Sequence, residues 1–456
     1  MNRRQFLQRS ALGAAGFYAA GCATAPRKIA ANEKLNIGII GVAHQGAYDM
    51  NNVAGENIVA LCDVDDTLLA GAKAKFPAAK TYNDFRRLLD QQDIDAVVIA
   101  TPDHTHAVAT AAALRSGRHV YCEKPLSRTI SECRVVTELA RKHKRITQIG
   151  TQIHSGENYR QVVEKIRSGA IGPVNEVHVW VNATYGGKDA PTATPPIPAN
   201  LHYDLWLGPV KPRPYSPEYV PFNWRHWWAF GGGALGDFGC HYLDLPHWAL
   251  GLGAPLSAEV VDGPARHPDS TPPWLIVRYE YPGSLAGRAV PILAGWLRDL
   301  KLTWYHGGKK PALLPANLAA KWDSGVLFVG EKGMLLAGYT RHVILRDPNF
   351  ADYADPANLD SDFTQHHRNW IQAIKTGKPA PSDSERVATP SKAPTASKPP
   401  AESKPSPATD AAATASPAPA AGKATSSPAP AGKAAASSTV GTPSATTARE
   451  AAASTN

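Results

Sequence analysis

An acid and an imidazole, Asp237 and His241, stand four residues apart in the stretch ALGDFGCHYLD. On a helix this spacing places both side chains on one face, where the carboxylate can fix the tautomer of the imidazole. A base whose pKa lies near neutral pH suits the removal of a hydroxyl proton while a hydride leaves a carbinol carbon. Gly236 and Gly239 leave room for a ring against this helix start. The alternative is a solvated ion pair on a surface helix.

The elements that would position this pair begin with KLNIGIIGVAHQG (34–46), an apolar run that turns through Gly41, Ala43 and Gly46. A strand, a glycine-rich turn and a helix form the dinucleotide-binding arrangement, because the helix N-terminus offers free N–H groups to a pyrophosphate. Ala43 replaces the middle glycine of this pattern, and its methyl group would sit where backbone and pyrophosphate touch. This departure weakens the prediction of a cofactor without excluding one.

A second strand, NIVALCDVD (57–65), carries Asp63 22 residues after Gly41. A carboxylate at this place can accept the ribose hydroxyls of NAD and would repel the extra phosphate of NADP, so we expect NAD. A helix cap is the alternative role for Asp63. Strands and helices then alternate, and they predict a doubly wound parallel sheet; the strands are expected in 95–102, 117–125 and 146–150, with helices over 105–116 and 130–144.

Five stretches together resemble the Gfo/Idh/MocA oxidoreductases, the family of glucose–fructose oxidoreductase and inositol dehydrogenase. They are GIIGVAHQG (38–46), ALCDVD (60–65), ATPDHTH (100–106), HVYCEKPLS (119–127) and GALGDFGCH (233–241). The resemblance implies an NAD(P)-binding Rossmann domain over residues 34–150. It also implies a substrate-binding α+β domain over residues 151–380, whose open, mostly antiparallel sheet often makes the contact of a homo-oligomer.

The resemblance assigns roles as well. Asp237 and His241 fall on the family pattern D-x-x-x-H, and Lys124 of the EKP motif would reach the reacting oxygen. An ammonium there would stabilise a developing alkoxide and lower the pKa of the base. Side chains from two motifs would line the nicotinamide end of the cofactor: Thr101, Pro102, His106, Glu123 and Lys124.

Candidate substrate residues come from two further stretches that fit an exported branch of the family. IGTQIHS (149–155) contains Gln152 and His154, and PFNWRHWW (221–228) contains Trp224 and Arg225. A polar loop histidine and a tryptophan in the core are the alternatives. We expect no metal site, because the histidines at 104 and 106 lack a third ligand at suitable spacing.

Residues 1–33 are expected to form an export signal and a linker. In MNRRQFLQRS, Arg3 and Arg4 precede a short apolar run that is typical of a twin-arginine signal peptide and too short to span a bilayer. Cleavage after residues 23–25 and lipidation of Cys22 are alternatives. Recognition by the twin-arginine export machinery would place the protein in the periplasm or the cell envelope.

Residues 381–456 are expected to form a disordered tail. From Ser382 onwards the chain contains no aromatic residue, Leu, Ile or Met, so it cannot bury enough apolar area to fold. The resemblance ends near this point, where the family continues with a helix and a final strand. The formal net charge of +9 includes five basic residues in 1–28, and the remaining +4 is dispersed, which argues against a nucleic-acid partner.

The sequence therefore predicts an exported NAD(P)-dependent oxidoreductase that acts on a secondary alcohol of a sugar, cyclitol or related polyol with a tightly bound cofactor. One alternative is an NAD-dependent glycosidase that oxidises its substrate transiently, since the same three residues would serve it. The other is an inactive protein that binds cofactor or sugar, which Ala43 and the missing C-terminal segment favour.

Overall fold

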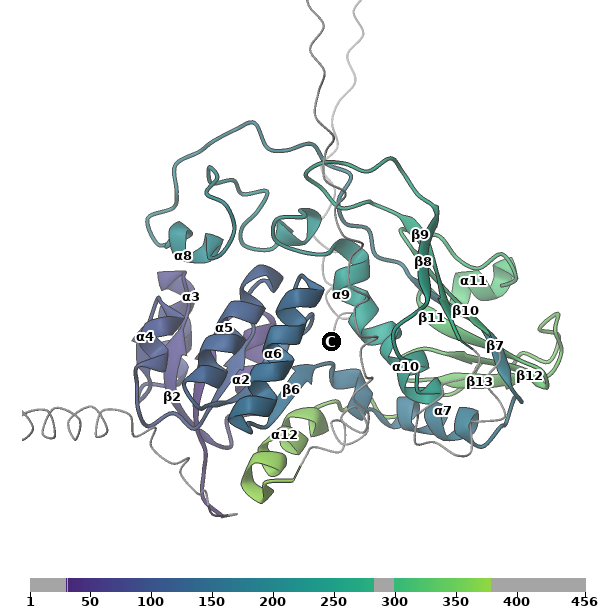
Figure 1. Ribbon diagram of the computed structural model, residues 1–456, viewed down its shortest axis with the longest axis horizontal. Helices are drawn as coiled ribbons and strands as arrows, with labels where there is room; N and C mark the ends of the chain where they lie inside the picture. Colours follow the sequence, from purple (N-terminus) through teal and green to yellow (C-terminus); the bar gives the residue numbers. More distant parts are fainter. Residues whose placement is uncertain (1–29, 31, 283–298, 379–456) are drawn as a thin grey trace, which may run out of the picture. The chain divides into compact units, whose positions relative to one another are not determined.

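The computed structural model describes residues 30, 32–282 and 299–378. Six parallel strands form the sheet of the first domain in the order β3-β2-β1-β4-β5-β6. This domain is drawn in purple and blue at the left of Figure 1. They are β1 (Asn36–Ile40), β2 (Asn57–Cys62), β3 (Lys80–Tyr82), β4 (Ala96–Ile99), β5 (His119–Glu123) and β6 (Thr147–Gly150). The doubly wound parallel sheet is thus confirmed. The strand order reverses between β1 and β4, and in such sheets a crevice for ligands opens at the carboxyl ends of these strands.

Helices cover both faces of this sheet, because alternate residues of its strands enter two different cores. Ile37 and Ile39 of β1 belong to one core, whereas Ile40 belongs to the other. The first core includes residues of α2 (Gln45–Asn52) and α3 (Asp66–Lys75). The second includes residues of α4 (Phe85–Leu89), α5 (Asp103–Arg115) and α6 (Ile130–His143). Burial on both faces explains why the strands are almost entirely apolar.

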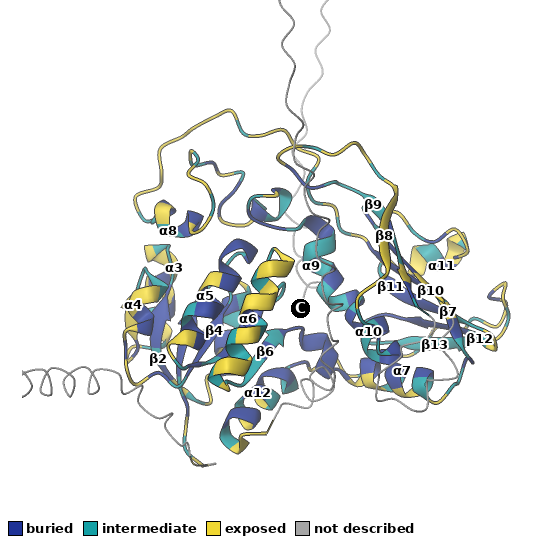
Figure 2. Cartoon of the chain, viewed as in Figure 1, coloured by how far each residue is buried: buried dark blue, intermediate teal, exposed yellow. Residues whose placement is uncertain are grey.

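The second domain contains a seven-stranded sheet in the order β13-β12-β11-β7-β10-β9-β8. Its strands are β7 (Val174–Val181), β8 (Ser257–Asp262), β9 (Leu275–Tyr281), β10 (Leu300–His306), β11 (Gly325–Gly330), β12 (Gly333–Ala337) and β13 (His342–Leu345). Only the pairing of β7 with β10 is parallel, so the expected mostly antiparallel sheet is confirmed. Every residue of the edge strand β8 is exposed (Figure 2).

Helices and short turns complete this domain. α7 (Glu157–Arg167) and α10 (Asp244–Leu250) pack against each other and share one core with the sheet. α9 (Gly233–Tyr242) leads directly into α10. The remaining elements are η1 (Gln152–Ser155), α8 (Tyr203–Leu207), η2 (Asn223–His226) and α11 (Ala316–Lys321).

The last described helix, α12 (Gln365–Thr376), packs on the first domain although it follows the second domain in the chain. Its Trp370 and Ile374 belong to the same core as Ile37 and Met50. This helix falls within the range 151–380 that we expected to form the substrate domain. A segment from the far end of the fold therefore completes the nucleotide domain.

The predicted export signal and the predicted tail lie outside the described residues. Within the residues that the structure does describe, no helix combines the length and the apolar character needed to cross a membrane.

Candidate active site

The candidate site joins the end of β5 to α9. Lys124 Nζ lies 2.5 Å from Asp237 Oδ1 and 3.1 Å from the carbonyl oxygen of the same residue. The other carboxylate oxygen, Oδ2, accepts a hydrogen bond of 3.1 Å from the Tyr185 hydroxyl and lies 3.2 Å from Arg225 Nε. The fold thus brings together Lys124 and Asp237, which stand 113 positions apart in the chain.

Both members of this ion pair are charged at neutral pH. Burial raises the pKa of Asp237, but Lys124 and Arg225 outweigh it and hold that pKa well below its usual range. Burial lowers the pKa of Lys124, but Asp237 outweighs it, so the pKa of the ammonium is raised. Because both side chains are largely shielded from solvent, salt screens this pair little.

His241 lies one turn further along α9 and is neutral. Burial, and next the charge of Lys124, lower the pKa of His241 to about 3. Its Nδ1 atom is buried and has no hydrogen-bond partner among the described residues. A neutral imidazole with an unused nitrogen can accept a proton, although the pKa of His241 lies below the near-neutral value that we expected for the base. The effect of Lys124 on this base has the direction that we expected.

The prediction of a hydrogen bond between Asp237 and His241 was wrong. Both oxygens of Asp237 are engaged by Lys124, Arg225 and Tyr185. A carboxylate binds cationic donors more strongly than it binds a neutral imidazole, so the cations displace the local partner. Asp237 therefore orients the ammonium of Lys124 rather than the ring of His241.

Two residues of the site were not predicted. Tyr185 lies in the irregular segment after β7, where no spacing or motif marks it. Asp103 is the first residue of α5 and is 4% exposed. Burial, and next the charge of Asp237, raise the pKa of Asp103 to about 8, so this acid is largely neutral at pH 7. Its position directly after Thr101 and Pro102 in ATPDHTH was the available signal.

The turn after β1 fits a dinucleotide. Gly41 has φ +87°, and a Cβ there would lie 2.5 Å from the carbonyl oxygen of Ala100. A Cβ on Gly46 would lie 2.1 Å from the carbonyl oxygen of Gly41, so neither glycine tolerates a side chain. The first turn of α2 has no side-chain cap and no acidic residue that would repel an anion such as the pyrophosphate of NAD. Two of its N–H groups, those of Gly46 and Ala47, donate to the carbonyl oxygens of Ala43 and His44. Ala43 lies partly exposed in this turn.

Asp63 lies beside the same turn. Its Oδ2 accepts from the N–H of Val42 and its Oδ1 from the N–H of Asp65, each at 3.0 Å. Each oxygen has a second lone pair, so the carboxylate can also accept the hydroxyls of a ribose. Asp65 caps α3, because its side chain accepts from the first-turn N–H groups of that helix. The alternative role of Asp63 as the helix cap is therefore excluded.

We expected His106 to line the cofactor site, but the structure places it elsewhere. It is buried, and its ring nitrogens lie 2.7 Å from the carbonyl oxygen of Pro125 and 2.6 Å from that of Thr101. Both nitrogens face backbone atoms, so His106 ties together the loops that carry the two motifs. Thr101 and Pro102 remain partly exposed at the start of α5.

The four candidate substrate residues differ in their positions. Gln152 is buried and donates to Glu123, while His154 is buried 2.7 Å from Asp244 and stacks on Trp248. Trp224 belongs to a hydrophobic core, which was the alternative reading of this residue. Only Arg225 reaches the site, with its guanidinium 4.1 Å from the ring centroid of Trp224. Burial thus argues against direct substrate contact for the other three.

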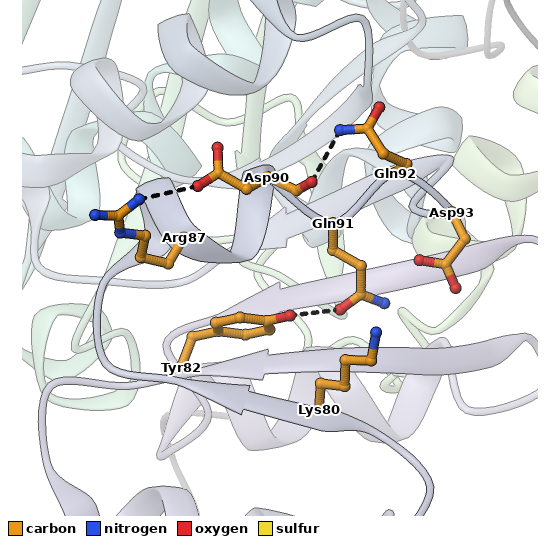
Figure 3. A pocket seen from close by; sticks show the side chains of 7 residues that line it. All are labelled: Lys80, Tyr82, Arg87, Asp90, Gln91, Gln92 and Asp93. Carbon is orange, nitrogen blue, oxygen red and sulfur yellow. Dashed lines mark hydrogen bonds and ion pairs between the residues drawn. The ribbon is translucent and has the colours of Figure 1, made fainter.

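A surface hollow of about 610 Å³ lies elsewhere on the first domain (Figure 3). Its lining consists of Lys80, Tyr82, Arg87, Asp90, Gln91, Gln92 and Asp93. Several of these side chains bind one another; the Tyr82 hydroxyl donates to Gln91 at 2.9 Å. The hollow shares no residue with the candidate site. We assign it no function.

Family comparison agrees with this geometry. Residues 35–151 match the family description "Oxidoreductase family, NAD-binding Rossmann fold". Residues 167–312 match "Oxidoreductase family, C-terminal alpha/beta domain" of the same family. The chain belongs to the Gfo/Idh/MocA oxidoreductase family. Its first domain is therefore the NAD-binding Rossmann domain of that family.

Individual members of the Gfo/Idh/MocA family match parts of the chain. Inositol 2-dehydrogenase of Salmonella typhimurium is 35% identical over 150 residues, which are 32% of this chain and 45% of that protein. A glycosyl hydrolase family 109 protein of Shewanella pealeana is 27% identical over 201 residues, 38% of this chain and 44% of that protein. The chain thus spans less than half the length of these curated relatives.

The fold itself extends further than these sequence matches. The crystal structure of an oxidoreductase from Thermotoga maritima superposes with a TM-score of 0.53 at 18% identity. The superposition covers 78% of this chain and 93% of that one.

Proposed function

We propose that the protein is an NAD-dependent oxidoreductase that acts on a secondary alcohol of a sugar, cyclitol or related polyol and retains its cofactor tightly. The contact between Lys124 and Asp237, next to a neutral His241, carries this proposal. The NAD-binding domain of the family and the inositol 2-dehydrogenase among the relatives support the class of substrate.

The chain supplies the proton transfer and the charge. Neutral His241 takes the proton of the substrate hydroxyl, and the Lys124 ammonium stabilises the negative charge that develops on that oxygen. Asp237 holds the ammonium in place, while Arg225 and Tyr185 hold Asp237. The turn of Gly41 and Gly46 and the carboxylate of Asp63 would hold NAD, which would supply the acceptor for the hydride of the carbinol carbon as the alcohol becomes a ketone.

Mass spectrometry of the protein as purified tests the cofactor and the reaction together. We expect NAD to co-elute with the chain and to become NADH when a polyol from a panel of inositols and aldoses is added. A chain that carries no nucleotide and cannot be loaded with one, or a bound NAD that no polyol reduces, would contradict the proposal.

A second candidate function is an NAD-dependent glycosidase, which the similarity to the glycosyl hydrolase family 109 protein favours. Such an enzyme would oxidise a sugar, eliminate the aglycone, add water and reduce the product with the same cofactor. Cleavage of a nitrophenyl glycoside without accumulation of NADH would indicate this function. Accumulation of NADH without cleavage indicates the simple oxidoreductase.

We also propose that the protein is exported by the twin-arginine machinery, on the basis of Arg3 and Arg4 before the apolar run. Replacement of both arginines by lysine is expected to retain the protein in the cytoplasm in a cell-fractionation experiment. Unchanged fractionation would contradict export by this route. If the protein incorporates labelled palmitate and Cys22→Ser abolishes this labelling, the protein is a lipoprotein. If the wild type incorporates no palmitate, cleavage of the signal is favoured.

The open sheet remains our candidate for a contact between copies of the chain. A hollow of about 440 Å³ on this sheet is lined by residues of β7, β8, β9 and β10, among them His178, Val261 and Tyr305. Light scattering of the wild type and of Val261→Asp tests the contact. A dimer that Val261→Asp dissociates supports it, and a wild-type monomer refutes it.

A further inference from the structure

A buried group of polar side chains lies next to Lys124 but outside the proposed reaction site. It includes Glu123, which we expected to line the nicotinamide end of the cofactor and which is instead buried among other polar side chains. Its centre consists of Asp49 on α2, Glu123 at the end of β5 and His367 on α12, which are 0%, 4% and 0% exposed. Gln45 and Gln152 complete the group. The three elements come from distant parts of the chain, and α12 closes the group from the C-terminal side.

One amide nitrogen bridges the two carboxyl groups. Gln45 Nε2 donates to Asp49 Oδ1 at 3.2 Å and to Glu123 Oε1 at 3.3 Å. His367 Nε2 lies 2.9 Å from the same oxygen of Asp49, and Gln152 Nε2 lies 2.5 Å from the same oxygen of Glu123. The side-chain donors thus converge on one oxygen of each acid, while the other oxygen of Glu123 accepts from the backbone N–H of Lys124 at 3.3 Å. The other oxygen of Asp49 is buried and has no hydrogen-bond partner in the described part of the chain.

Two ionised carboxylates in this arrangement would be strongly unfavourable. Both are buried and both approach the same nitrogen atom. Among the described residues, no Lys or Arg forms an ion pair with either carboxylate. His367 does not compensate them, because burial lowers the pKa of His367 to about 4 and leaves the ring neutral. One proton shared by the two acids removes the repulsion. The unpartnered oxygen of Asp49 can then carry this proton.

We propose that Asp49 and Glu123 share one proton, and that this proton keeps the Glu123 carboxyl from pairing with the adjacent ammonium of Lys124. The ammonium is thereby left to Asp237. Asp49, Glu123 and His367 are positioning residues that act through Lys124. The catalytic consequence rests on the proposed function, whereas the shared proton does not.

The charges around the group agree with this arrangement. Burial, and next the neighbouring carboxyl of Asp49, raise the pKa of Glu123 to about 8, and burial raises the pKa of Asp49 to about 8. Lys124 acts on Glu123 in the opposite direction. The other titratable or charged side chains near this group include Tyr48, Tyr121, Cys122, Asp362 and Arg368.

The shared proton makes stability depend on pH in a defined window. In the unfolded chain both acids titrate near pH 4, whereas in the folded chain they hold the proton up to about pH 8. The folded state therefore binds more protons between these limits, and its stability falls as pH rises through this window. One additional bound proton changes the unfolding equilibrium constant by about tenfold per pH unit.

Urea unfolding of the full chain at several pH values between 5 and 8 tests this inference. In the wild type the shared proton changes the unfolding equilibrium constant by about tenfold per pH unit. In Asp49→Asn we expect most of this change to disappear, because Glu123 then has no second acid beside it. Lys375→Met is the matched control. It removes a different polar contact between α12 and the first domain, the 2.7 Å contact with Glu56, and should leave the dependence unchanged.

An unchanged dependence on pH in Asp49→Asn would overturn the inference, and so would an equal weakening in Lys375→Met. Should Asp49→Asn fail to fold, Glu123→Gln makes the same test. With an active substrate in hand, we expect about a tenfold lower kcat and an unchanged KM in His367→Gln. If the pH dependence behaves as expected but no polyol reduces the bound cofactor, the proposed function fails and the shared proton stands.

Discussion

Replacement of Asp237 by Asn tests the charge balance of the site most sharply. Asp237 is the common partner of Lys124 and Arg225, and its side chain is only 11% exposed. The variant keeps the shape of the side chain but leaves two partly buried cations without a counter-charge. Removing one partner of a buried pair costs about 3–5 kcal/mol, and the partial exposure of both cations places our expectation at about 3 kcal/mol.

A double-mutant cycle separates this effect from a general loss of packing. Lys124→Met alone leaves Asp237 with Arg225 and Tyr185, so we expect a smaller loss of stability than in Asp237→Asn. In the double variant the loss should be less than the sum of the two single losses by about 0.5–3 kcal/mol, because one uncompensated cation has been removed.

The assay is urea unfolding of the full chain, followed by tryptophan fluorescence, with the free energy of unfolding taken for the wild type and the three variants. Additive losses would refute the proposed coupling between Lys124 and Asp237. A loss below about 1 kcal/mol in Asp237→Asn would show that solvent, rather than the carboxylate, compensates the cations.

Three further predictions concern the base and the cofactor. His241→Ala should lower kcat about 10²–10⁴-fold without changing the affinity for NAD, and an unchanged kcat would count against this base. The wild-type pH–rate profile should lack a limb near pH 6.5, because the pKa of His241 is about 3. Gly46→Ala should abolish the retention of NAD, since its Cβ would meet the carbonyl oxygen of Gly41 at 2.1 Å, and normal nucleotide content after purification would disprove that reading. Asp63→Ala should reduce the preference for NAD over NADP in calorimetric titrations, and an unaltered ratio of affinities would remove Asp63 from the ribose site.

The backbone of the first domain was predictable from local sequence. Apolar runs, the glycine turn at Gly41 and Gly46, and the alternation of strands with helices depend on short-range rules that the residues themselves impose. The resemblance to a family placed Lys124 in one site with Asp237 and His241, but it did not predict the direct contact between Lys124 and Asp237. Spacing alone cannot indicate which of two distant residues will share a cleft.

The errors concern the direction of side chains. The four-residue spacing of Asp237 and His241 permits a hydrogen bond, but Lys124 and Tyr185 donate to the carboxylate and Arg225 forms an ion pair with it. His106, Gln152 and His154 stand in the matching motifs, yet tertiary packing buries each of them. His367 is buried because α12 packs on the first domain. The periodicity of that segment predicts a helix but does not indicate the domain on which the helix packs.

Transfer of deuterium tests the central claim most directly. A polyol that carries deuterium on its reacting carbinol carbon is mixed with the NAD-loaded protein. The cofactor is then released, and its mass is measured by mass spectrometry. The account predicts deuterium in the nicotinamide ring for the wild type, and at least about a hundredfold slower labelling for His241→Ala that still holds its NAD. Absence of the label in the wild type with every polyol tried, or equal transfer by both proteins, would contradict it.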